Sequence, residues 1–324
     1  MENEFKNRVD LSGLTEKTQL VKAEIGKYIV GQHQLIDFLL IAILADGHVL
    51  IEGVPGVAKT LTAKLLAKAI DANFKRIQFT PDLMPSDIIG TAIFNSKTTD
   101  FEFKKGPLFA NIVLTDEINR SPAKTQAALF EAMEERQITA DGNTYKLEEP
   151  FMVLATQNPI EQEGTYRLPE AQLDRFLFKI NVSYPSLEEE GTMLLNFHNN
   201  KHKIDIDVIK PVLTKKSIIE LRAIVSNIIV EAHLIKYITQ IVNSTRKNAG
   251  LFLGASPRAS LAILNAAKAN ACLQNRDFVT PEDIKYVCFP VLRHRIMLTP
   301  EKEMEGVQVD TVIQQIIDKV EVPR

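Results

Sequence analysis

Short apolar runs alternate with longer amphipathic segments over the first 180 residues of the chain. A short, continuously apolar run is typical of a strand buried on both faces of a parallel sheet. Apolar positions that recur every three or four residues are typical of a helix with one buried face. The pattern predicts strands at residues 48–51, 75–79, 112–117, 152–156 and 176–180. It predicts helices at residues 15–29, 34–45, 61–70 and 121–136, the last of them capped by Ser121.

Two further segments between these elements predict β-hairpins, because strand-like residues flank a short polar turn in each. The first hairpin is expected to bring residues 93–94 opposite residues 101–103, with a polar tip between them. The second is expected to pair residues 138–140 with residues 144–146 around Gly142. Both would be insertions between elements of the core.

The pattern changes near residue 184, and almost every later segment predicts a helix. Ser186, Ser256 and Thr280 each stand at a capped helix start. A chain of 324 residues also exceeds the size at which a single core keeps growing, which favours two domains. We therefore predict an α/β domain with a parallel sheet over residues 1–184 and a smaller all-helical domain over residues 185–324.

Composition narrows the possible classes of protein. Apolar residues make up 45% and charged residues 24% of the chain, as in an ordinary globular protein. The net charge of −3 argues weakly against nonspecific binding to nucleic acid, which needs a basic field. The longest apolar run, residues 35–45, contains Asp37 and is too short to span a bilayer, so we expect a cytoplasmic protein. Cys272 and Cys288 lie far apart in sequence and are expected to be reduced core residues.

Residues 53–60, Gly-Val-Pro-Gly-Val-Ala-Lys-Thr, join a predicted strand to a predicted helix. The backbone N–H groups at a helix start have no intrahelical partner, and the helix dipole places positive potential there. Glycines let this backbone close around phosphate oxygens, Lys59 adds a positive charge, and Thr60 offers a hydroxyl to Mg²⁺. The stretch therefore predicts a phosphate-binding loop. Ala58 departs from the general pattern, which has glycine before the lysine, and requires a backbone conformation that glycine adopts more easily.

Asp116 and Glu117 end the predicted strand at residues 112–117. A carboxylate at this end of a strand can hold Mg²⁺ beside Thr60, and its neighbour can activate a water for attack on the γ-phosphate. The alternative for such a pair is a solvated turn. The phosphate-binding loop earlier in the same chain favours the catalytic interpretation.

The motifs together resemble those of MoxR-type AAA+ ATPases. They are residues 53–60, Thr-Asp-Glu-Ile-Asn-Arg (115–120), the end of the helix at residues 131–136, Ala-Thr-Gln-Asn-Pro (155–159), Leu-Pro-Glu-Ala-Gln-Leu-Asp-Arg-Phe (168–176) and Gly-Ala-Ser-Pro-Arg (254–258). The resemblance extends from about Val30 to the C-terminus, and the alanine at position 58 is similar to the family's own version of the loop. It implies a P-loop AAA+ core with hairpin insertions, followed by a helical lid.

The resemblance also implies roles for particular residues. ATP would be bound by Val30, Gly31, Gly53, Pro55, Gly56, Val57, Ala58, Lys59, Thr60 and Leu61. Thr60 and Asp116 would hold Mg²⁺, and Glu117 would be the catalytic base. Asn158 would be the sensor that orients the attacking water; its alternative is a turn residue before Pro159.

Two arginines complete the implied catalytic set. Arg175 resembles the arginine finger that reaches the γ-phosphate of a neighbouring subunit, and its alternative is an ion pair within its own subunit. Arg258 would be a second sensor, brought onto the nucleotide from the helical domain. A finger supplied by a neighbour implies a homo-oligomeric ring, for which we expect a hexamer.

A ring of this kind would couple ATP hydrolysis to chaperone-like remodelling or maturation of a client protein. The resemblance implies a partner with a von Willebrand A domain and metal-cofactor insertion as one outcome. Two other functions stay open. One is a nucleic-acid motor, because Lys97, Lys104 and Lys105 lie in or near the first hairpin. The other is a nucleotide-gated binding module with little turnover, against which the intact pair Asp116 and Glu117 argues.

Overall fold

A five-stranded parallel sheet forms the centre of the N-terminal part. The computed structural model describes residues 11–158, 168–199 and 209–323. The order of the strands is β2-β5-β8-β1-β9, and all four neighbouring pairs are parallel. The strands are β1 (Val49–Gly53), β2 (Phe74–Gln78), β5 (Ile112–Asp116), β8 (Met152–Gln157) and β9 (Phe178–Val182). All five strands expected from the sequence are present, which confirms the α/β core.

The apolar residues of the central strands are buried on both faces of this sheet. Successive side chains of a strand point to opposite faces, so each strand contributes to two cores. Leu50 and Val113 belong to one buried cluster, whereas Ile51 and Leu114 belong to the other. The continuously apolar runs in the sequence are a consequence of this double burial.

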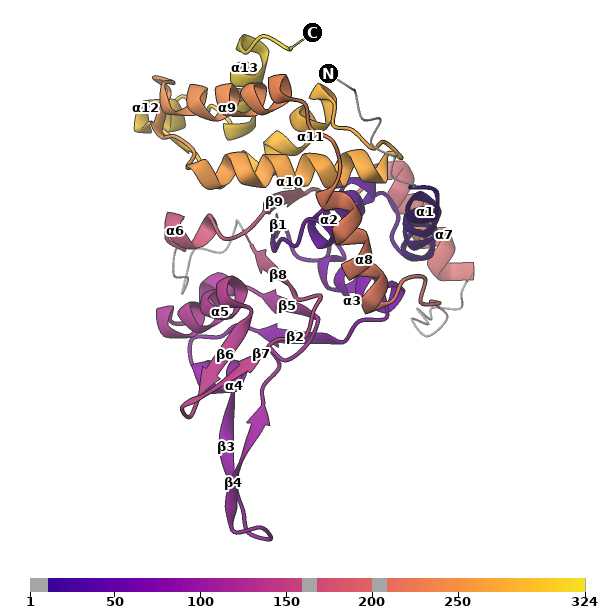
Figure 1. The fold of residues 1–324 in the computed structure, drawn as a ribbon, viewed down its shortest axis with the longest axis vertical. Coiled ribbons are helices and arrows are strands. Elements are labelled where there is room, and N and C mark those ends of the chain that lie inside the picture. The colour runs from indigo at the N-terminus through magenta and orange to yellow at the C-terminus, as the bar shows by residue number, and fades with distance from the viewer. Residues whose placement is uncertain (1–10, 159–167, 200–208, 324) are drawn as a thin grey trace, which may run out of the picture.

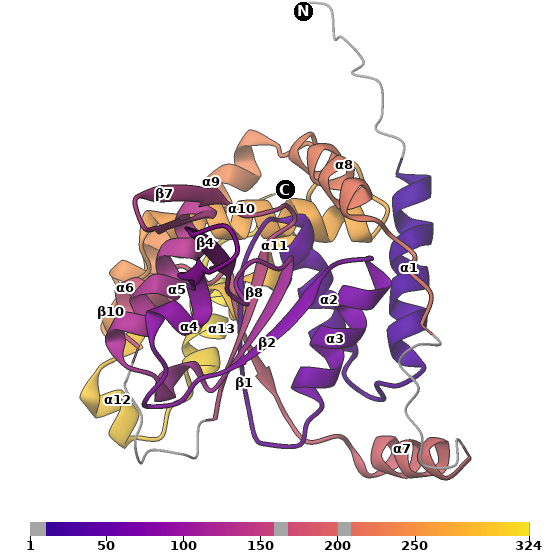
Figure 2. The same cartoon turned by 90° about the horizontal axis from the view of Figure 1, so that it is seen from below.

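Helices cover the two faces of the sheet unequally (Figure 2). The face that includes Ile51 is covered by α1 (Ser12–Gly26), α2 (His33–Leu44) and α3 (Lys59–Ala69). The opposite face is covered mainly by α5 (Ala123–Glu135), with the short α4 (Pro85–Ile89) beside it. Helix α5 begins after Pro122, so the prediction that Ser121 caps it is wrong. Pro122 is the N-cap and offers no side-chain acceptor; its backbone carbonyl accepts the N–H groups of Thr125 and Gln126.

Both predicted hairpins are present on the α5 side of the molecule. Strands β3 (Gly90–Asn95) and β4 (Asp100–Lys105) form a hairpin that projects well beyond the sheet, as Figure 1 shows. Strands β6 (Gln137–Ala140) and β7 (Asn143–Lys146) form the second hairpin near its base.

The register of the first hairpin departs in part from the prediction. Phe94 lies opposite Phe101, as expected, but Phe103 lies opposite Ala92. Its ring stacks instead on Tyr145 of the second hairpin, with 4.5 Å between the ring centroids. The two hairpins are therefore joined by aromatic contacts, which single-strand patterns do not reveal.

The C-terminal part is mainly helical and lies at one end of the sheet (Figure 1). Its helices are α7 (Leu187–Asn199), α8 (Lys215–Ser226), α9 (Ala232–Arg246), α10 (Pro257–Leu273), α11 (Pro281–Leu292), α12 (Pro300–Met304) and α13 (Val309–Lys319). The sequence did not predict the small antiparallel pair formed by β10 (Leu251–Leu253) and β11 (Met297–Leu298). These strands are too short to give a strand pattern of their own.

The other features expected of this part are present. Ser186 and Glu189 form the predicted capping box at the start of α7. Cys272 and Cys288 are buried and free, and burial raises the pKa of each thiol to about 12.

In the part of the chain that the structure describes, no helix is long and apolar enough to cross a membrane.

The carboxylate of Asp283, at the start of α11, is buried and accepts several hydrogen bonds, and its replacement by alanine should destabilise the helical part. It accepts both terminal Nη groups of Arg276 at 2.6 Å, the Asn270 amide at 2.7 Å and the Thr280 N–H at 2.8 Å. Asp283→Ala would remove the cap of α11 and leave the buried Asn270 amide without this acceptor, so the free energy of unfolding should fall by about 2–4 kcal/mol. Denaturant unfolding would measure this loss. Glu282→Gln, at an exposed neighbour, is the control, and a loss below about 1 kcal/mol for Asp283→Ala would contradict the prediction.

Candidate functional site

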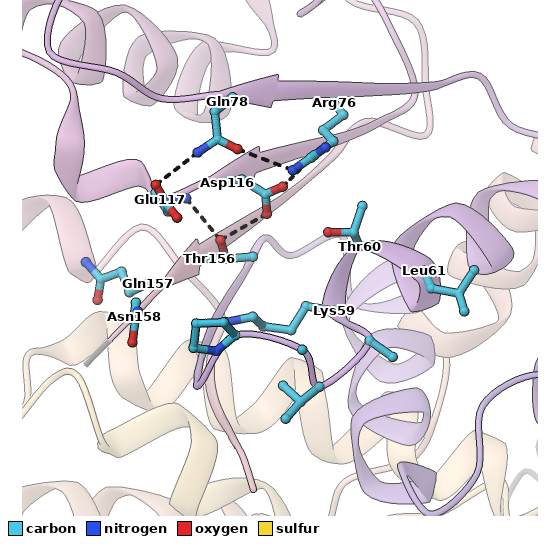
Figure 3. A pocket seen from close by; sticks show the side chains of 14 residues that line it. Lys59, Thr60, Leu61, Arg76, Gln78, Asp116, Glu117, Thr156, Gln157 and Asn158 are labelled. Atoms are coloured by element: carbon cyan, nitrogen blue, oxygen red, sulfur yellow. Dashed lines mark hydrogen bonds and ion pairs between the residues drawn. The ribbon is translucent and has the colours of Figure 1, made fainter. Parts of the chain in front are cut away.

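A cavity of about 390 Å³ opens at the carboxyl ends of the central strands (Figure 3). It is lined by Pro55, Gly56, Val57, Ala58, Lys59, Thr60, Leu61, Arg76, Gln78, Asp116, Glu117, Thr156, Gln157 and Asn158. Strands β1, β2, β5 and β8, or the turns that follow them, supply one side of the cavity, and the start of α3 supplies the other. Carboxyl ends of parallel strands are the common place for ligand sites in open α/β sheets.

The loop between β1 and α3 has the conformation that an anion-binding turn requires. Gly56 and Ala58 both have positive φ, at 88° and 59°. Ala58 thus adopts the left-handed conformation that its place in the motif demands, and α3 begins at the next residue. Lys59, Thr60 and Leu61 of the first turn of α3 line the cavity, and N–H groups at a helix start have no intrahelical partner, so a phosphate there could accept them.

Lys59 lies between the loop and the acidic side of the cavity. Its Nζ donates to the backbone carbonyl of Gly53 at 2.5 Å. Burial lowers the pKa of Lys59, and the negative charges of Asp116 and Glu117 partly oppose this shift. A bound polyanion would add further negative charge beside the ammonium group and would stabilise its charged form.

Both carboxylate oxygens of Asp116 have partners across the sheet. Oδ2 accepts Nε of Arg76 at 2.6 Å, and Oδ1 accepts the hydroxyl of Thr156 at 3.1 Å. The Arg76 side chain is half exposed, so it can leave Asp116 without unfolding any part of the core. Thr60 faces Asp116 across the cavity, as Figure 3 shows. Together these two residues offer the oxygen ligands that Mg²⁺ prefers.

Glu117 follows the strand in a left-handed backbone conformation, with φ of 56°. Non-glycine residues adopt this conformation rarely, and such strain is found most often at functional sites. Its Oε2 accepts the side-chain amide of Gln78 at 3.0 Å and lies 3.1 Å from Nε of Arg120. The Glu117 N–H donates to the Thr156 hydroxyl at 3.0 Å. The carboxylate is therefore held on the rim of the cavity by groups from neighbouring elements.

Sequence reasoning missed four residues of this cavity: Arg76, Gln78, Thr156 and Gln157. Arg76 and Gln78 belong to β2, which pairs with β5 so that Gln78 lies beside Asp116. Residues two apart in a strand lie on the same face, so Arg76 and Gln78 both lie on the cavity side. This spacing is the only feature of the sequence that could have indicated them. It became useful only once the pairing of β2 with β5 was known.

The structure brings only some of the other predicted residues to the cavity. Asn158 lines it, while Pro159 lies outside the described residues. Val30 and Gly31 do not line it. A Cβ at Gly31 would lie 2.3 Å from the carboxyl carbon of Glu189, so this segment packs against the start of α7. It lies beyond the carboxyl end of β9, the strand next to β1.

Arg175 and Arg258 lie together, but away from the cavity of their own chain. Nη1 of Arg175 is 2.6 Å from one carboxylate oxygen of Glu134, and Nη2 of Arg258 is 3.2 Å from the other. Glu134 belongs to the last turn of α5, at the opposite end of that helix from Asp116 and Glu117. The ion pair within the subunit, which was the alternative for Arg175, is thus present, and neither arginine is among the residues that line the cavity.

Comparisons with known proteins agree with this geometry. The family model of the ATPase family associated with various cellular activities (AAA) matches residues 48–178, and the AAA lid domain matches residues 243–316. The first match contains the loop, Asp116, Glu117 and Arg175, and the second contains Arg258. The crystal structure of a provisionally assigned ATPase from Cytophaga hutchinsonii has a TM-score of 0.89 and 45% identity, and it covers 96% of this chain and 97% of that chain.

Several relatives match this chain over most of its length. YeaC of Bacillus subtilis is 50% identical over 299 residues, which are 92% of either chain. Chaperone MoxR1 of Mycobacterium tuberculosis is 44% identical over 310 residues, which cover 93% of this chain and 81% of that protein. Protein MoxR of Methylorubrum extorquens is 30% identical over 93% of each. The chain therefore belongs to the MoxR family of AAA ATPases.

Proposed function

We propose that this protein hydrolyses ATP in the cavity between α3 and the carboxyl ends of β2, β5 and β8. The observation that carries the proposal is the convergence, in one cavity, of Lys59 and Thr60 from the loop with Asp116 and Glu117 from β5. Lys59 and the start of α3 lie on one side of the cavity, and the carboxylates of Asp116 and Glu117 lie on the other. ATP with Mg²⁺ provides the matching charges, since the phosphates are anionic and the metal is cationic.

Each of these residues has a distinct role in the proposed reaction. The loop and Lys59 hold the β- and γ-phosphates, and Thr60 and Asp116 supply oxygen ligands for Mg²⁺. Among the residues that the structure describes, no cluster of three His, Cys, Asp or Glu side chains could hold a metal without a nucleotide. This fits Mg²⁺, which is bound through one or two side chains together with substrate phosphates, and which neutralises phosphate charge when bound.

The remaining polar groups orient and activate the water that attacks the γ-phosphate. Glu117 accepts the proton of the attacking water, and Asn158 orients that water toward the γ-phosphate. Gln78 donates to Glu117 and fixes the direction of its carboxylate. Val30 and Gly31, beyond the neighbouring strand end, would contact the adenine, which extends away from the phosphates.

The position of Arg175 and Arg258 supports a shared active site. They lie beside Glu134 and not in the cavity of their own chain, so each would reach a nucleotide only in a neighbouring subunit. This changes the role expected for Arg258, which acts across the interface with Arg175 and not as a lid sensor for its own nucleotide. A head-to-tail contact of this kind closes into a ring, for which we propose a hexamer.

We further propose that the ring acts on protein clients. A homologue bears the name chaperone MoxR1, and the strands of the β3–β4 hairpin expose the apolar side chains of Ile93, Phe94 and Phe101 next to its polar tip. Exposed apolar groups on a projecting hairpin suit contact with a protein more than with phosphates. A partner with a von Willebrand A domain, and maturation or metal-cofactor insertion as the outcome, complete the proposal on the basis of the family resemblance alone.

The test is ATP turnover per subunit at increasing protein concentration, with the mass of the particle measured in the same buffer. We expect turnover per subunit to rise as the ring assembles, because the monomer lacks the neighbour's arginines. Flat turnover from a protein that stays monomeric at all concentrations would contradict the shared site. Absence of turnover in an assembled ring would contradict the hydrolytic activity itself.

A further inference from the structure

One carboxylate, that of Glu134, joins the two arginines that are proposed to act across the interface. Oε2 accepts Nη1 of Arg175 at 2.6 Å, and Oε1 accepts Nη2 of Arg258 at 3.2 Å. Glu134 lies in the last turn of α5, where the helix dipole disfavours a negative charge. A glutamate at this place does not stabilise the helix. The contacts of Glu134 with the two arginines give a better reason for its presence there.

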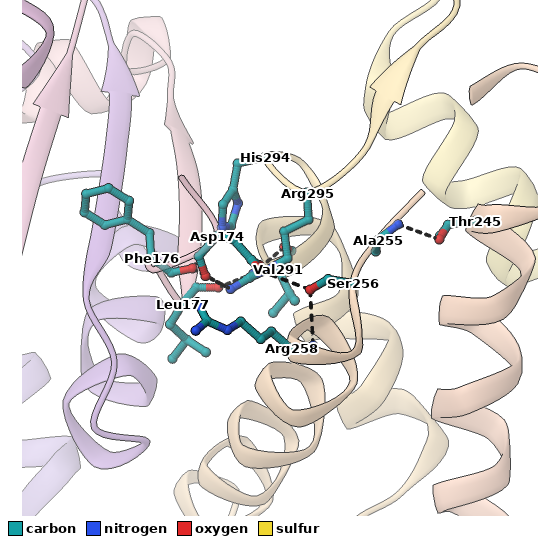
Figure 4. Close-up of polar contacts among 10 residues, drawn as sticks. All are labelled: Asp174, Phe176, Leu177, Thr245, Ala255, Ser256, Arg258, Val291, His294 and Arg295. Carbon is teal, nitrogen blue, oxygen red and sulfur yellow. Dashed lines mark hydrogen bonds and ion pairs between the residues drawn. The ribbon is translucent and has the colours of Figure 1, made fainter. Parts of the chain in front are cut away.

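A second carboxylate, that of the half-buried Asp174, connects the two segments that carry these arginines (Figure 4). Asp174, next to Arg175 in the chain, accepts Nε of Arg295 at 2.6 Å and the hydroxyl of Ser256 at 3.1 Å. Ser256 in turn caps α10 by accepting the N–H of Arg258 at 3.2 Å. Arg295 is almost fully buried and also donates to the Phe176 carbonyl at 2.6 Å. The backbones that carry Arg175 and Arg258 are thus fixed relative to each other, and Glu134 fixes their side chains.

We propose that Glu134 is a positioning residue that holds Arg175 and Arg258 as one pair and presents both to the nucleotide of the neighbouring subunit. Two guanidinium groups repel each other at short range, and a carboxylate between them removes that repulsion. Each arginine donates to Glu134 through one terminal nitrogen, and within the described residues its other terminal nitrogen has no recorded acceptor and could donate to a phosphate oxygen. The three side chains together carry a net charge of about +1, which still attracts an anion. The inference rests on the proposed function.

The test compares Glu134→Gln with Glu135→Gln in the assembled protein. Both remove one negative charge from the end of α5, but Glu135 is exposed and has no recorded polar contact in the described part of the chain. We expect Glu134→Gln to lower kcat by about 10- to 100-fold, because misplaced catalytic groups cost rates of this order. The KM for ATP should change by less than about threefold, because the phosphate loop is untouched. Glu135→Gln should match the parent protein in both.

A comparison in a background that lacks both arginines distinguishes a positioning role of Glu134 from a general structural effect. In an Arg175→Ala, Arg258→Ala background, Glu134→Gln should cause no further loss of kcat, because it acts only through those arginines. A further loss there, or an unchanged or higher kcat for Glu134→Gln alone, would overturn the inference. If the arginine variants themselves keep full turnover, the proposed shared site fails. If they lose turnover while Glu134→Gln does not, only the positioning role fails.

Discussion

Replacing Glu117 with glutamine should leave ATP binding intact and lower the turnover rate by about 300-fold. Glutamine can still accept the amide of Gln78 and occupies the same volume, but it cannot take a proton from the attacking water. The loop residues that hold the phosphates are unchanged. Phosphate release under saturating ATP measures the turnover rate, and a titration with a fluorescent ATP analogue measures the affinity.

Two lysine variants on α3 show how the same titration responds when nucleotide binding is lost and when it is not. Lys59→Ala should abolish binding in the same titration, because it removes the charge that faces the phosphates. Lys64→Ala, at an exposed position one turn further along the helix, should bind as the parent does. Full turnover in Glu117→Gln would show that another group is the base. Loss of nucleotide affinity in this variant would show that Glu117 holds the ligand itself.

Replacing Arg175 with alanine should lower turnover in the assembled protein by about 1,000-fold, in line with the contribution of arginine fingers elsewhere. The KM for ATP should change little, because Arg175 lies outside the cavity that binds the nucleotide of its own chain. Steady-state kinetics at a protein concentration that saturates assembly would measure both. Lys236→Ala, which removes an exposed positive charge from α9, should have no effect.

Mixing two inactive variants tests whether the finger acts in a neighbour. Arg175→Ala retains the base, and Glu117→Gln retains the finger. In a random ring made from equal amounts, about one interface in four would combine an intact base with an intact finger from the next subunit. We expect turnover to reappear on mixing. If it does not, although mass measurements show that mixed rings form, Arg175 serves its own subunit.

Much of the fold could be predicted because its strands are buried on both faces. Continuous apolar runs identified β1, β5 and β8, and the glycine turn placed the loop between β1 and α3. The pairing of Phe103 with Tyr145 could not be predicted, because it depends on how two hairpins lie against each other. The β10–β11 pair was missed because two or three residues per strand give no periodicity.

In the candidate site too, residues within local motifs could be predicted, whereas residues placed by the tertiary arrangement could not. Lys59, Thr60, Asp116 and Glu117 follow one another closely within two local motifs, so their convergence was predictable from strand–turn–helix geometry. Gln78 depends on the register between β2 and β5, which a single sequence does not specify. The position of Arg258 beside Glu134 depends on how the helical part docks, and local pattern carries no information about that.

The parallel pair β1–β9 links two parts of this molecule that are proposed to act on different nucleotides. The phosphate loop leaves β1 at its carboxyl end, whereas Arg175 precedes β9 at its amino end. The five paired residues between them span about 16 Å of hydrogen-bonded sheet. This ladder of hydrogen bonds resists bending. In a ring, a change at one nucleotide would therefore reach the next as a movement of the whole sheet and not as a local distortion of it.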